Sequence, residues 1–338
     1  MAKCIHLIVD SRHYAGIESH VFHLSSMLRD KALDVQVVLL NDYGPHPLCD
    51  KLAERTIPVL KLDGQAKTLW RYIRAIEPQD VIHTHGYKAG ILCRLFGVVA
   101  RRKVVSTYHC GDRGKGLMAI YTWLDKFTQR LSNNIAVSEE INRWLGNSAV
   151  VLDNFVCQTS VVFNPNRAAR KLAFVGRFSY EKGPDNFVKL AEAFEGDTSL
   201  SFTMFGDGPM AGYIKQNTPS NTKLMGFCAD LEQHWPDIDG LVISSRKEGM
   251  PMVAIEAMMR GIPVIAAPCG ALPELLGEGY RGWLANSSDA EDLFAVLDQW
   301  RRSSKAELRE VTARARAHAI QCCSGEQQWS QLKVLYAV

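Results

Sequence analysis

Apolar runs of strand length alternate with amphipathic segments along the whole chain. Thirteen such runs are rich in Val, Ile and Leu: 4–10, 35–40, 58–62, 80–85, 103–109, 134–138, 149–153, 171–177, 200–206, 223–227, 240–245, 263–268 and 282–285. Helix-like stretches separate many of them: 17–30, 68–77, 87–100, 185–194, 210–216, 252–260 and 289–301. This alternation favours parallel sheets that are covered by helices on both faces. The sequence therefore predicts an α/β fold with doubly wound, Rossmann-like sheets.

The irregular segment 156–170 divides the predicted elements into two groups. It has no clean period and carries Asn, Pro and Arg, as linkers often do. We therefore expect a first domain over 1–160, a second over 168–322, and a terminal helix over 323–338 whose apolar residues share one face. In two doubly wound domains, ligands bind beyond the carboxyl ends of the strands, so we expect a cleft between the domains, lined by the loops that follow strands.

Composition indicates an ordinary globular protein, with 47% hydrophobic and 22% charged residues in a chain of 338. That length suffices for two buried cores. Residues 1–165 carry 20 Lys and Arg against 15 Asp and Glu, while the remainder carries 19 against 21. A mildly basic first half suits ordinary surface variation, an acidic ligand or an anionic membrane. It lacks the basic stripe of a nucleic-acid-binding protein, so we expect no nucleic-acid partner.

Cysteine usage and hydropathy bear on the compartment. The nine cysteines include no C-x-x-C pair, which is typical of a reduced, cytoplasmic protein. The first ten residues have the pattern of a strand rather than of a signal peptide. No apolar run approaches the roughly 20 residues that a membrane-spanning helix needs. Any contact with a membrane is therefore expected to be peripheral.

The segment 115–132 has the period of an amphipathic helix. Its apolar stripe consists of Leu117, Ile120, Tyr121, Leu124, Phe127 and Leu131. Packing of this stripe against the core is the expected role. A membrane-surface role is the alternative, favoured by nearby Lys115, Lys126 and Arg130 and by Trp123 off the stripe.

The stretch 248–256, EGMPMVAIE, offers the most specific chemistry. It lies between an apolar run and a helix-forming segment that stops at Gly261, with Pro251 expected at the first helical position. The first backbone N–H groups of such a helix, those of Met252 and Val253, are free to bind an anion such as phosphate. Glu248 and Glu256 flank this end as acceptors for hydroxyl groups. The combination suits a sugar nucleotide.

Other loops after strands add donors and space. Arg177 and Lys182 flank a glycine turn after the run 171–177, where two cations can neutralise a diphosphate. Gly206 leaves room for a ligand after the next run, and Phe227 is placed to stack on a base.

In the first half, Gly16 opens a helix after the first run, where the backbone can approach a phosphate or a sugar, although a simple turn explains it equally well. His109 ends a strand and is expected to reach a ligand hydroxyl. His83 and His85 alternate on one strand and are expected to be core or interface residues. A zinc site would need three or four convergent ligands; we expect none.

Taken together, the motifs resemble the retaining nucleotide-sugar glycosyltransferases of family 4 (group 1), which have the GT-B fold. The resemblance rests on GR-x4-KG from Gly176 and on S-x2-EG followed by the second carboxylate of the E-x7-E pair, together with a later G-x2-E and G-W-L. It extends over essentially the whole chain. Departures lie at Ala15, Phe155 and Cys269, where the family pattern has glycine.

The resemblance implies a role for each candidate residue. Glu248 would contact the donor sugar and Glu256 would contact the ribose, while Gly249 and Met250 would belong to the donor-binding residues. Arg177 and Lys182 would hold the diphosphate, while His109 and Gly16 would lie near the reacting sugar and phosphate.

The resemblance also implies transfer with retention at the anomeric carbon, without a metal or other cofactor. The first domain would bind a glycan or lipid-linked acceptor, and the terminal helix would cross back to it. Synthesis of bacterial cell-surface polysaccharide or lipopolysaccharide, on the cytoplasmic face of the inner membrane, is the expected setting. A GT-B sugar-nucleotide epimerase and a non-catalytic sugar-nucleotide-binding protein are the alternatives.

Overall fold

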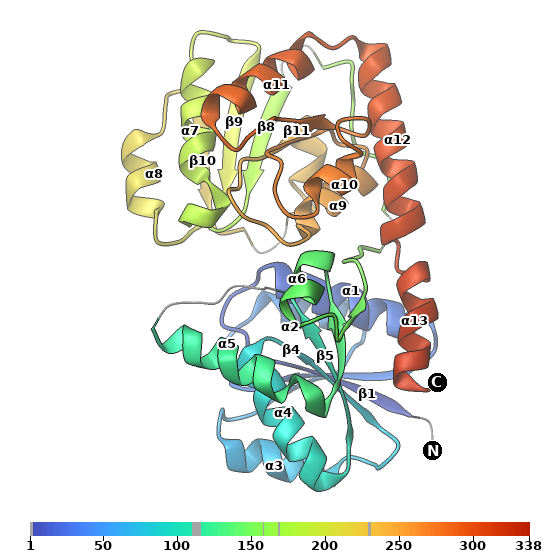
Figure 1. Ribbon diagram of the computed structural model, residues 1–338. Helices are drawn as coiled ribbons and strands as arrows, with labels where there is room; N and C mark the ends of the chain where they lie inside the picture. The colour runs from blue at the N-terminus through green and yellow to red at the C-terminus, as the bar shows by residue number, and fades with distance from the viewer. Residues whose placement is uncertain (1–2, 110–115, 158, 168–169, 229–230) are drawn as a thin grey trace. The chain divides into compact units, whose positions relative to one another are not determined.

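The computed structural model describes residues 3–109, 116–157, 159–167, 170–228 and 231–338. The chain forms two compact units (Figure 1). Unit 1 consists of Met1–Cys157 and Gly325–Val338, and unit 2 of Gln158–Ser324. The first boundary, after Cys157, falls within the irregular segment 156–170. The second boundary lies after Ser324, close to residue 323, where the terminal helix was predicted to start.

Unit 1 contains a parallel sheet of seven strands in the order β3-β2-β1-β4-β5-β6-β7. The strands are β1 (Cys4–Val9), β2 (Asp34–Leu39), β3 (Val59–Lys61), β4 (Val81–His85), β5 (Lys103–Tyr108), β6 (Asn133–Ala136) and β7 (Val150–Val151). The helices are α1 (Gly16–Asp30), α2 (Pro47–Glu54), α3 (Ala66–Ala75), α4 (Tyr87–Ala100), α5 (Leu117–Thr128), the 3₁₀ turn η1 (Gln129–Leu131), α6 (Glu139–Trp144) and α13 (Glu326–Tyr336). The strand order reverses between β1 and β4, which makes this edge the ligand-binding switch point of the sheet.

Alternation along the strands of unit 1 produces a core on each face of the sheet. Leu7 of β1 packs with residues of α1, α2 and α13, while Ile8 packs on the other face with residues of α3 and α4. On α13, Leu332 and Tyr336 are buried, and the Tyr336 hydroxyl lies 2.6 Å from Nδ1 of His83. The terminal helix is thus an integral part of the core of unit 1.

Unit 2 contains a parallel sheet of six strands in the order β10-β9-β8-β11-β12-β13. The strands are β8 (Arg170–Val175), β9 (Leu200–Phe205), β10 (Thr222–Gly226), β11 (Gly240–Ile243), β12 (Val264–Ala266) and β13 (Trp283–Leu284). The helices are α7 (Pro184–Ala193), α8 (Ala211–Asn217), α9 (Met252–Met259), α10 (Leu272–Leu276), α11 (Ala290–Arg302) and α12 (Lys305–Cys323), with 3₁₀ turns η2 (Tyr180–Lys182) and η3 (Trp235–Asp237). Its switch point lies between β8 and β11.

Every one of the thirteen predicted runs overlaps one of the strands of the structure, and both sheets are parallel. The prediction of two Rossmann-like domains is therefore confirmed. The sequence Asp237-Ile238-Asp239 has the D-x-D spacing of some metal-binding sites, but it precedes β11 at the strand end away from the ligand edge, and buried Asp239 forms an ion pair with Arg167 at 2.9 Å.

The prediction that the apolar stripe of 115–132 packs against the core is wrong. Ile120, Tyr121, Phe127 and Leu131 are exposed, and Leu124 is only half-buried; Lys115 and the side chain of Leu117 lie outside the described residues. The buried side of α5 and η1 instead carries polar residues, because buried Arg94 on α4 supplies an ionic partner for Asp125 beneath the helix. The helix itself is present, but its polar side is buried and its apolar side is exposed.

Candidate functional site

In unit 2, two loops meet at the switch point of the sheet. The loop after β8 carries Lys182, and the loop after β11 carries Glu248. Lys182 Nζ lies 2.5 Å from Glu248 Oε2, and Ser245 donates its hydroxyl to Glu248 Oε1 at 2.7 Å. The Glu248 side chain is 7% exposed and that of Lys182 is 33% exposed. The carboxylate is thus fixed at both oxygens, and the ammonium remains accessible at the edge of the sheet.

A second ion pair clamps the two loops together. The Arg246 guanidinium forms a bidentate contact with the Asp185 carboxylate at 2.8 and 2.6 Å. The backbone N–H of Arg246 donates to the backbone carbonyl of Glu181 at 2.8 Å. The Asp185 carboxyl has a lowered pKa because Arg246 hydrogen-bonds to it. The Ser244 hydroxyl donates to the carbonyl of Gly183 at 2.8 Å. These contacts hold Lys182 and Glu248 in place before any ligand arrives.

Helix α9 begins at Met252, four residues after Glu248. Pro251 is the N-cap residue and has an extended conformation. It was predicted to be the first helical residue, a position that Met252 occupies in the structure. Gly261 follows the helix end with a φ of +71°, as expected for a residue just past a helix. Met252 and Val253 form the first turn, whose N–H groups have no preceding turn to accept them. Glu256 lies on the second turn, so the two carboxylates and this helix end share one region of unit 2.

Close backbone packing explains the glycines around this region. A Cβ at Gly206 would lie 1.9 Å from the carbonyl oxygen of Gly176. A Cβ at Gly270 would lie 2.4 Å from the carbonyl oxygen of Gly249, and Gly270 has a φ of +56°. Gly206 therefore joins the loops after β8 and β9, and Gly270 supports the backbone that carries Glu248. The role predicted for Gly206, room for a ligand, remains a prediction.

Arg177 and Phe227 are exposed at the same strand ends. Arg177 follows β8 and Phe227 follows β10, and the Phe227 side chain is 49% exposed. Both are accessible to a ligand at the carboxyl edge of the sheet. The structure thus brings Arg177, Lys182, Glu248 and the α9 terminus to one edge.

In unit 1, Gly16 and His109 also lie at carboxyl ends of strands. Gly16 opens α1 and is exposed, with no atom within 4 Å of the position that a Cβ would occupy. His109 follows β5, and its Nε2 lies 3.1 Å from Nδ1 of His85. The His20 ring on α1 lies 4.7 Å from the ring of His109. Helix α1, which begins at Gly16, therefore contacts His109 through the ring of His20.

Four imidazoles of unit 1, those of His20, His83, His85 and His109, form a cluster in which the first three are buried and His109 is half-buried. Burial lowers the pKa of His20 to about 4 and that of His83 to about 3, while the pKa values of His85 and His109 fall well below 6.5 because of burial and of neighbouring imidazoles. All four are therefore neutral at physiological pH, when a nitrogen of each can accept a hydrogen bond or bind a metal.

Three of these rings could hold a metal ion. Ligand atoms of His20, His85 and His109 all lie within 4.8 Å of one another. This is the convergence that a zinc site would require, and the sequence did not predict it. The prediction that the protein needs no metal remains untested.

The contacts that fix Glu248 and Lys182 were not predicted. Ser245 is the first residue of the S-x2-EG motif, but the motif does not show that its hydroxyl fixes Glu248, and the half-buried Arg246–Asp185 ion pair has no distinctive sequence pattern. The positions of Arg246 and Asp185 just after β11 and at the start of α7 are the signal that could have identified the pair. His20, in the second turn of α1, was also missed, because a histidine within a helical stretch has no distinctive sequence pattern.

Two family models match the chain. "Glycosyltransferase Family 4" matches residues 14–151, and "Glycosyl transferases group 1" matches residues 169–301. Among curated proteins, the phosphatidyl-myo-inositol mannosyltransferase of Mycolicibacterium smegmatis is 26% identical, covering 83% of this chain and 80% of its own. The UDP-Gal:alpha-D-GlcNAc-diphosphoundecaprenol alpha-1,3-galactosyltransferase of Escherichia coli is 24% identical, over 72% and 71%.

Solved structures agree on the fold. Anabaena HepE in complex with UDP-glucose has a TM-score of 0.82 and 18% identity, covering 99% of this chain and 100% of its own. A point mutant of TarM from S. aureus, solved with UDP and other ligands, has a TM-score of 0.82 at 12% identity, with coverage of 99% and 100%. With both sheets parallel and both family models matched in chain order, the chain belongs to the group 1, family 4 glycosyltransferases and has the GT-B fold.

Proposed function

We propose that this glycosyltransferase moves a sugar from a nucleotide-diphosphate sugar to a hydroxyl group with retention at the anomeric carbon. The Lys182–Glu248 pair beside the α9 terminus is the observation that carries the proposal. An ammonium, two first-turn amides and exposed Arg177 can neutralise a diphosphate, and a fixed carboxylate next to them can accept hydrogen bonds from sugar hydroxyls. Uridine is the proposed base, because HepE binds UDP and UDP-glucose.

The proposed mechanism needs no protein nucleophile. The acceptor hydroxyl attacks the anomeric carbon on the face from which the nucleotide diphosphate leaves, and a leaving phosphate oxygen takes the acceptor's proton. Arg177, Lys182 and the amides of α9 stabilise the charge that builds up on the leaving group. His109, a neutral imidazole, hydrogen-bonds the donor sugar rather than acting as a cation. No step uses a metal, because the cations of unit 2 balance the diphosphate.

The acceptor is proposed to be a glycan or a lipid-linked sugar held mainly by unit 1. Curated relatives include proteins named for colanic acid and amylovoran biosynthesis and the diphosphoundecaprenol galactosyltransferase. We propose that the enzyme acts in synthesis of a bacterial surface polysaccharide, in the cytoplasm or on the cytoplasmic face of the inner membrane; the names of these relatives support the pathway.

Nucleotide release measured across UDP-, GDP- and ADP-sugars, with and without cell-envelope extract, tests the proposal. We expect acceptor-dependent release of UDP that persists in EDTA, and a product whose anomeric proton coupling in NMR matches that of the donor. Turnover of the donor without an acceptor would indicate an epimerase instead. Donor binding without nucleotide release in any acceptor mixture would indicate a non-catalytic protein.

Matched variants connect the activity to the site. Lys182→Ala removes a cation from the leaving group and should reduce the rate about 100-fold, the usual effect of losing one stabilising donor. Lys333→Ala, on the exposed side of α13 in unit 1, changes the same residue type away from the site and should retain full activity. Full activity of Lys182→Ala would refute the proposed site.

A further inference from the structure

Helix α5 packs with its polar side inward. Thr122, Asp125 and Thr128 of α5 and Gln129 of the following turn are buried. In water, an amphipathic helix normally buries its apolar stripe and exposes its polar face. The reversed arrangement persists only because a dedicated partner is present beneath the helix.

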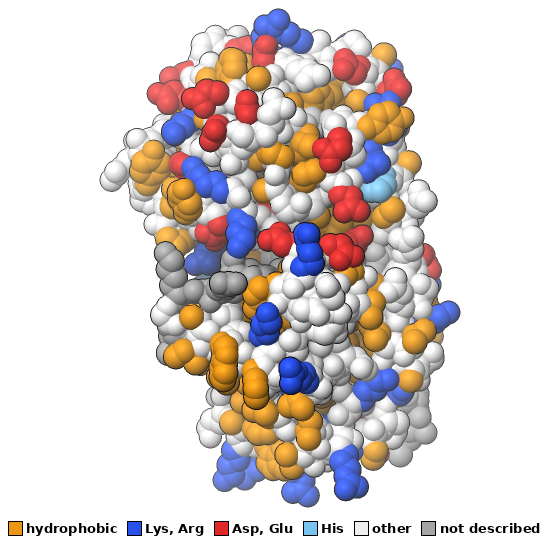
Figure 2. All heavy atoms as spheres, viewed as in Figure 1, with side chains coloured by type: hydrophobic (Ala, Val, Ile, Leu, Met, Phe, Trp, Pro, Cys, Tyr) orange, Lys and Arg blue, Asp and Glu red, His pale blue; other side chains and the backbone are white. Residues whose placement is uncertain are grey.

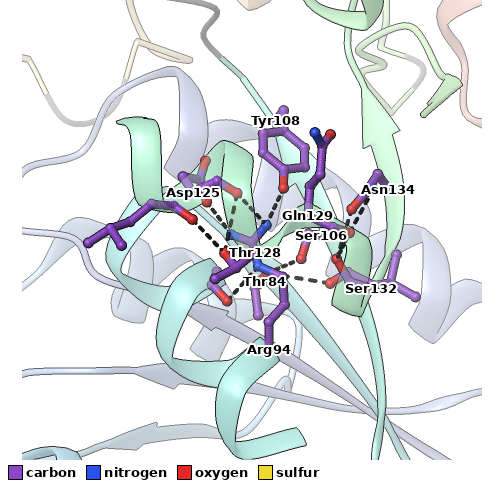
Figure 3. Close-up of polar contacts among 12 residues, drawn as sticks. Thr84, Arg94, Ser106, Tyr108, Asp125, Thr128, Gln129, Ser132 and Asn134 are labelled. Atoms are coloured by element: carbon purple, nitrogen blue, oxygen red, sulfur yellow. Dashed lines mark hydrogen bonds and ion pairs between the residues drawn. The ribbon is translucent and has the colours of Figure 1, made fainter. Parts of the chain in front are cut away.

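That partner is Arg94 on α4, whose side chain is fully buried. Figure 3 shows Arg94 pointing toward Asp125 and Tyr108. Its guanidinium contacts the carboxylate of Asp125 and the hydroxyl of Tyr108, and donates to the backbone carbonyls of Gly90 at 2.8 Å and Asp125 at 3.1 Å. The Thr128 hydroxyl donates to the carbonyl of Leu124 at 2.8 Å. Burying an arginine is costly unless every donor is satisfied. Unit 1 thus contains a polar network that holds α5 in this orientation.

The opposite side of α5 is apolar and exposed. Ile120, Trp123, Phe127 and Leu131 follow one another at spacings of three and four residues, and the rings of Trp123 and Phe127 stack at a centroid distance of 5.5 Å. Trp123 is 62% exposed and Phe127 is 66% exposed.

Helix α4, which packs against α5, extends this surface. Nine of the nineteen exposed large apolar side chains among the described residues lie on these elements: Leu95, Val98, Val99, Met118, Ile120, Tyr121, Trp123, Phe127 and Leu131. We call this set the α4–α5 face. Figure 2 shows hydrophobic side chains gathered over α4 and α5, with Lys and Arg side chains around them. A contiguous apolar surface of this kind marks a binding site for a partner or a membrane.

The charge of this region indicates which partner. Residues 87–138 contain nine Lys and Arg but only two Asp, a formal charge of +7 in a chain whose total is +3. Of these two acids, Asp125 is buried against Arg94 and contributes nothing to the surface. Lys126 and Arg130 are exposed on α5 and η1, and Arg101 is exposed at the end of α4. Cations around an apolar, aromatic-bearing helix face are the pattern of interfacial membrane helices.

We propose that the α4–α5 face docks on an anionic lipid bilayer, with Trp123 and Phe127 inserted among the headgroups and with Lys126, Arg130 and Arg101 facing the phosphates. Over the described part of the chain, no helix combines the length and the hydropathy of a bilayer-spanning segment, so α5 lies in the plane of the interface. A second copy of the chain fits less well, because self-pairing across this face would bring like charges together. The proposal concerns unit 1 and does not depend on the donor site of unit 2.

Flotation with vesicles of neutral phosphatidylcholine, and of the same lipid with anionic phosphatidylglycerol, tests the proposal on the full chain. We expect binding to anionic vesicles that weakens with salt, and little binding to neutral ones. The double variant Trp123→Ser/Phe127→Ser should reduce vesicle binding about tenfold or more, because it removes two interfacial aromatic rings. Lys126→Glu/Arg130→Glu should reduce binding to anionic vesicles specifically.

Helix α8 of unit 2 provides the matched control. Tyr213→Ser and Lys215→Glu change an exposed aromatic residue and an exposed cation there, and should leave vesicle binding unchanged. Circular dichroism and UDP binding should be unaltered in every variant, which separates loss of docking from misfolding and from failure of the donor site.

Three results would overturn the proposal. One is the absence of wild-type binding to anionic vesicles at low salt. The second is wild-type affinity in the Trp123→Ser/Phe127→Ser variant. The third is a concentration-dependent dimer that this variant abolishes, which would assign the face to a second copy of the chain.

Discussion

Substituting Asp125 by alanine removes the only carboxylate that contacts Arg94 among the described residues. In the native protein, the Arg94 side chain is 0% exposed and that of Asp125 is 4% exposed. Burial raises the pKa of the Asp125 carboxyl to about 6, while the charge of Arg94 and its hydrogen bond oppose this shift by favouring the ionised carboxylate. Asp125→Ala therefore leaves a buried arginine that retains only the hydroxyl of Tyr108 and backbone carbonyls.

The expected cost follows from this burial. Breaking a buried ion pair by removing one partner costs about 3–5 kcal/mol, whereas replacing both partners by apolar groups of similar volume is often nearly neutral. We therefore expect Asp125→Ala to lose about 3 kcal/mol or more of the free energy of unfolding of unit 1. The double variant Arg94→Met/Asp125→Leu should lose clearly less than this.

Urea denaturation of the wild-type protein, of Asp125→Ala and of the double variant measures these losses. Because the chain has two units, hydrogen exchange of peptides from α4 and α5 should accompany it, so that the loss is assigned to unit 1. A cost below about 1 kcal/mol for Asp125→Ala, or a double variant less stable than Asp125→Ala, would refute the reasoning that the Arg94 network holds α5 in place.

The remaining predictions concern pH and glycine packing. Because burial lowers the pKa of His20 to about 4 and that of His83 to about 3, these rings stay neutral in the folded state while the unfolded chain protonates near pH 6.5. The free energy of unfolding should therefore fall by about 1 kcal/mol per pH unit per histidine as the pH drops from 6.5 towards 4, as urea midpoints would reveal; constant midpoints from pH 7 to 5 would contradict this. Gly206→Ala should destabilise unit 2 by about 2 kcal/mol or more, because its Cβ would lie 1.9 Å from a carbonyl oxygen, whereas Gly212→Ala, with no atom within 4 Å, should not lower the melting temperature.

The strands and the donor loops were predictable because their signals are local. Buried parallel strands consist of continuous apolar runs, and a strand, a tight loop and a helix start place Glu248 and Lys182 at a carboxyl edge wherever the fold is doubly wound. The ion pair between them could not be read from the sequence, since 66 residues separate them and only the order of β8 and β11 in the sheet brings them together.

Helices were harder to interpret where tertiary structure decides the outcome. The period of α5 predicts the helix correctly, but it does not reveal which side is buried, because the buried partner Arg94 lies 31 residues away. Helix α12 buries small residues such as Ala315 and Ala319, whose apolar signal is weak. The histidine cluster joins α1, β4 and the end of β5, a convergence that no local spacing encodes.

The most direct test of the donor site is a calorimetric titration with UDP and with the UDP-sugar that supports turnover. In the proposed site, Glu248 contacts the sugar and Glu256 contacts the ribose. Glu248→Gln should therefore weaken binding of the UDP-sugar while UDP affinity stays the same or rises, because Lys182 is released for the phosphates. Glu256→Gln should weaken both ligands equally. Equal weakening of both ligands by Glu248→Gln, or unchanged UDP affinity in Glu256→Gln, would contradict these assignments.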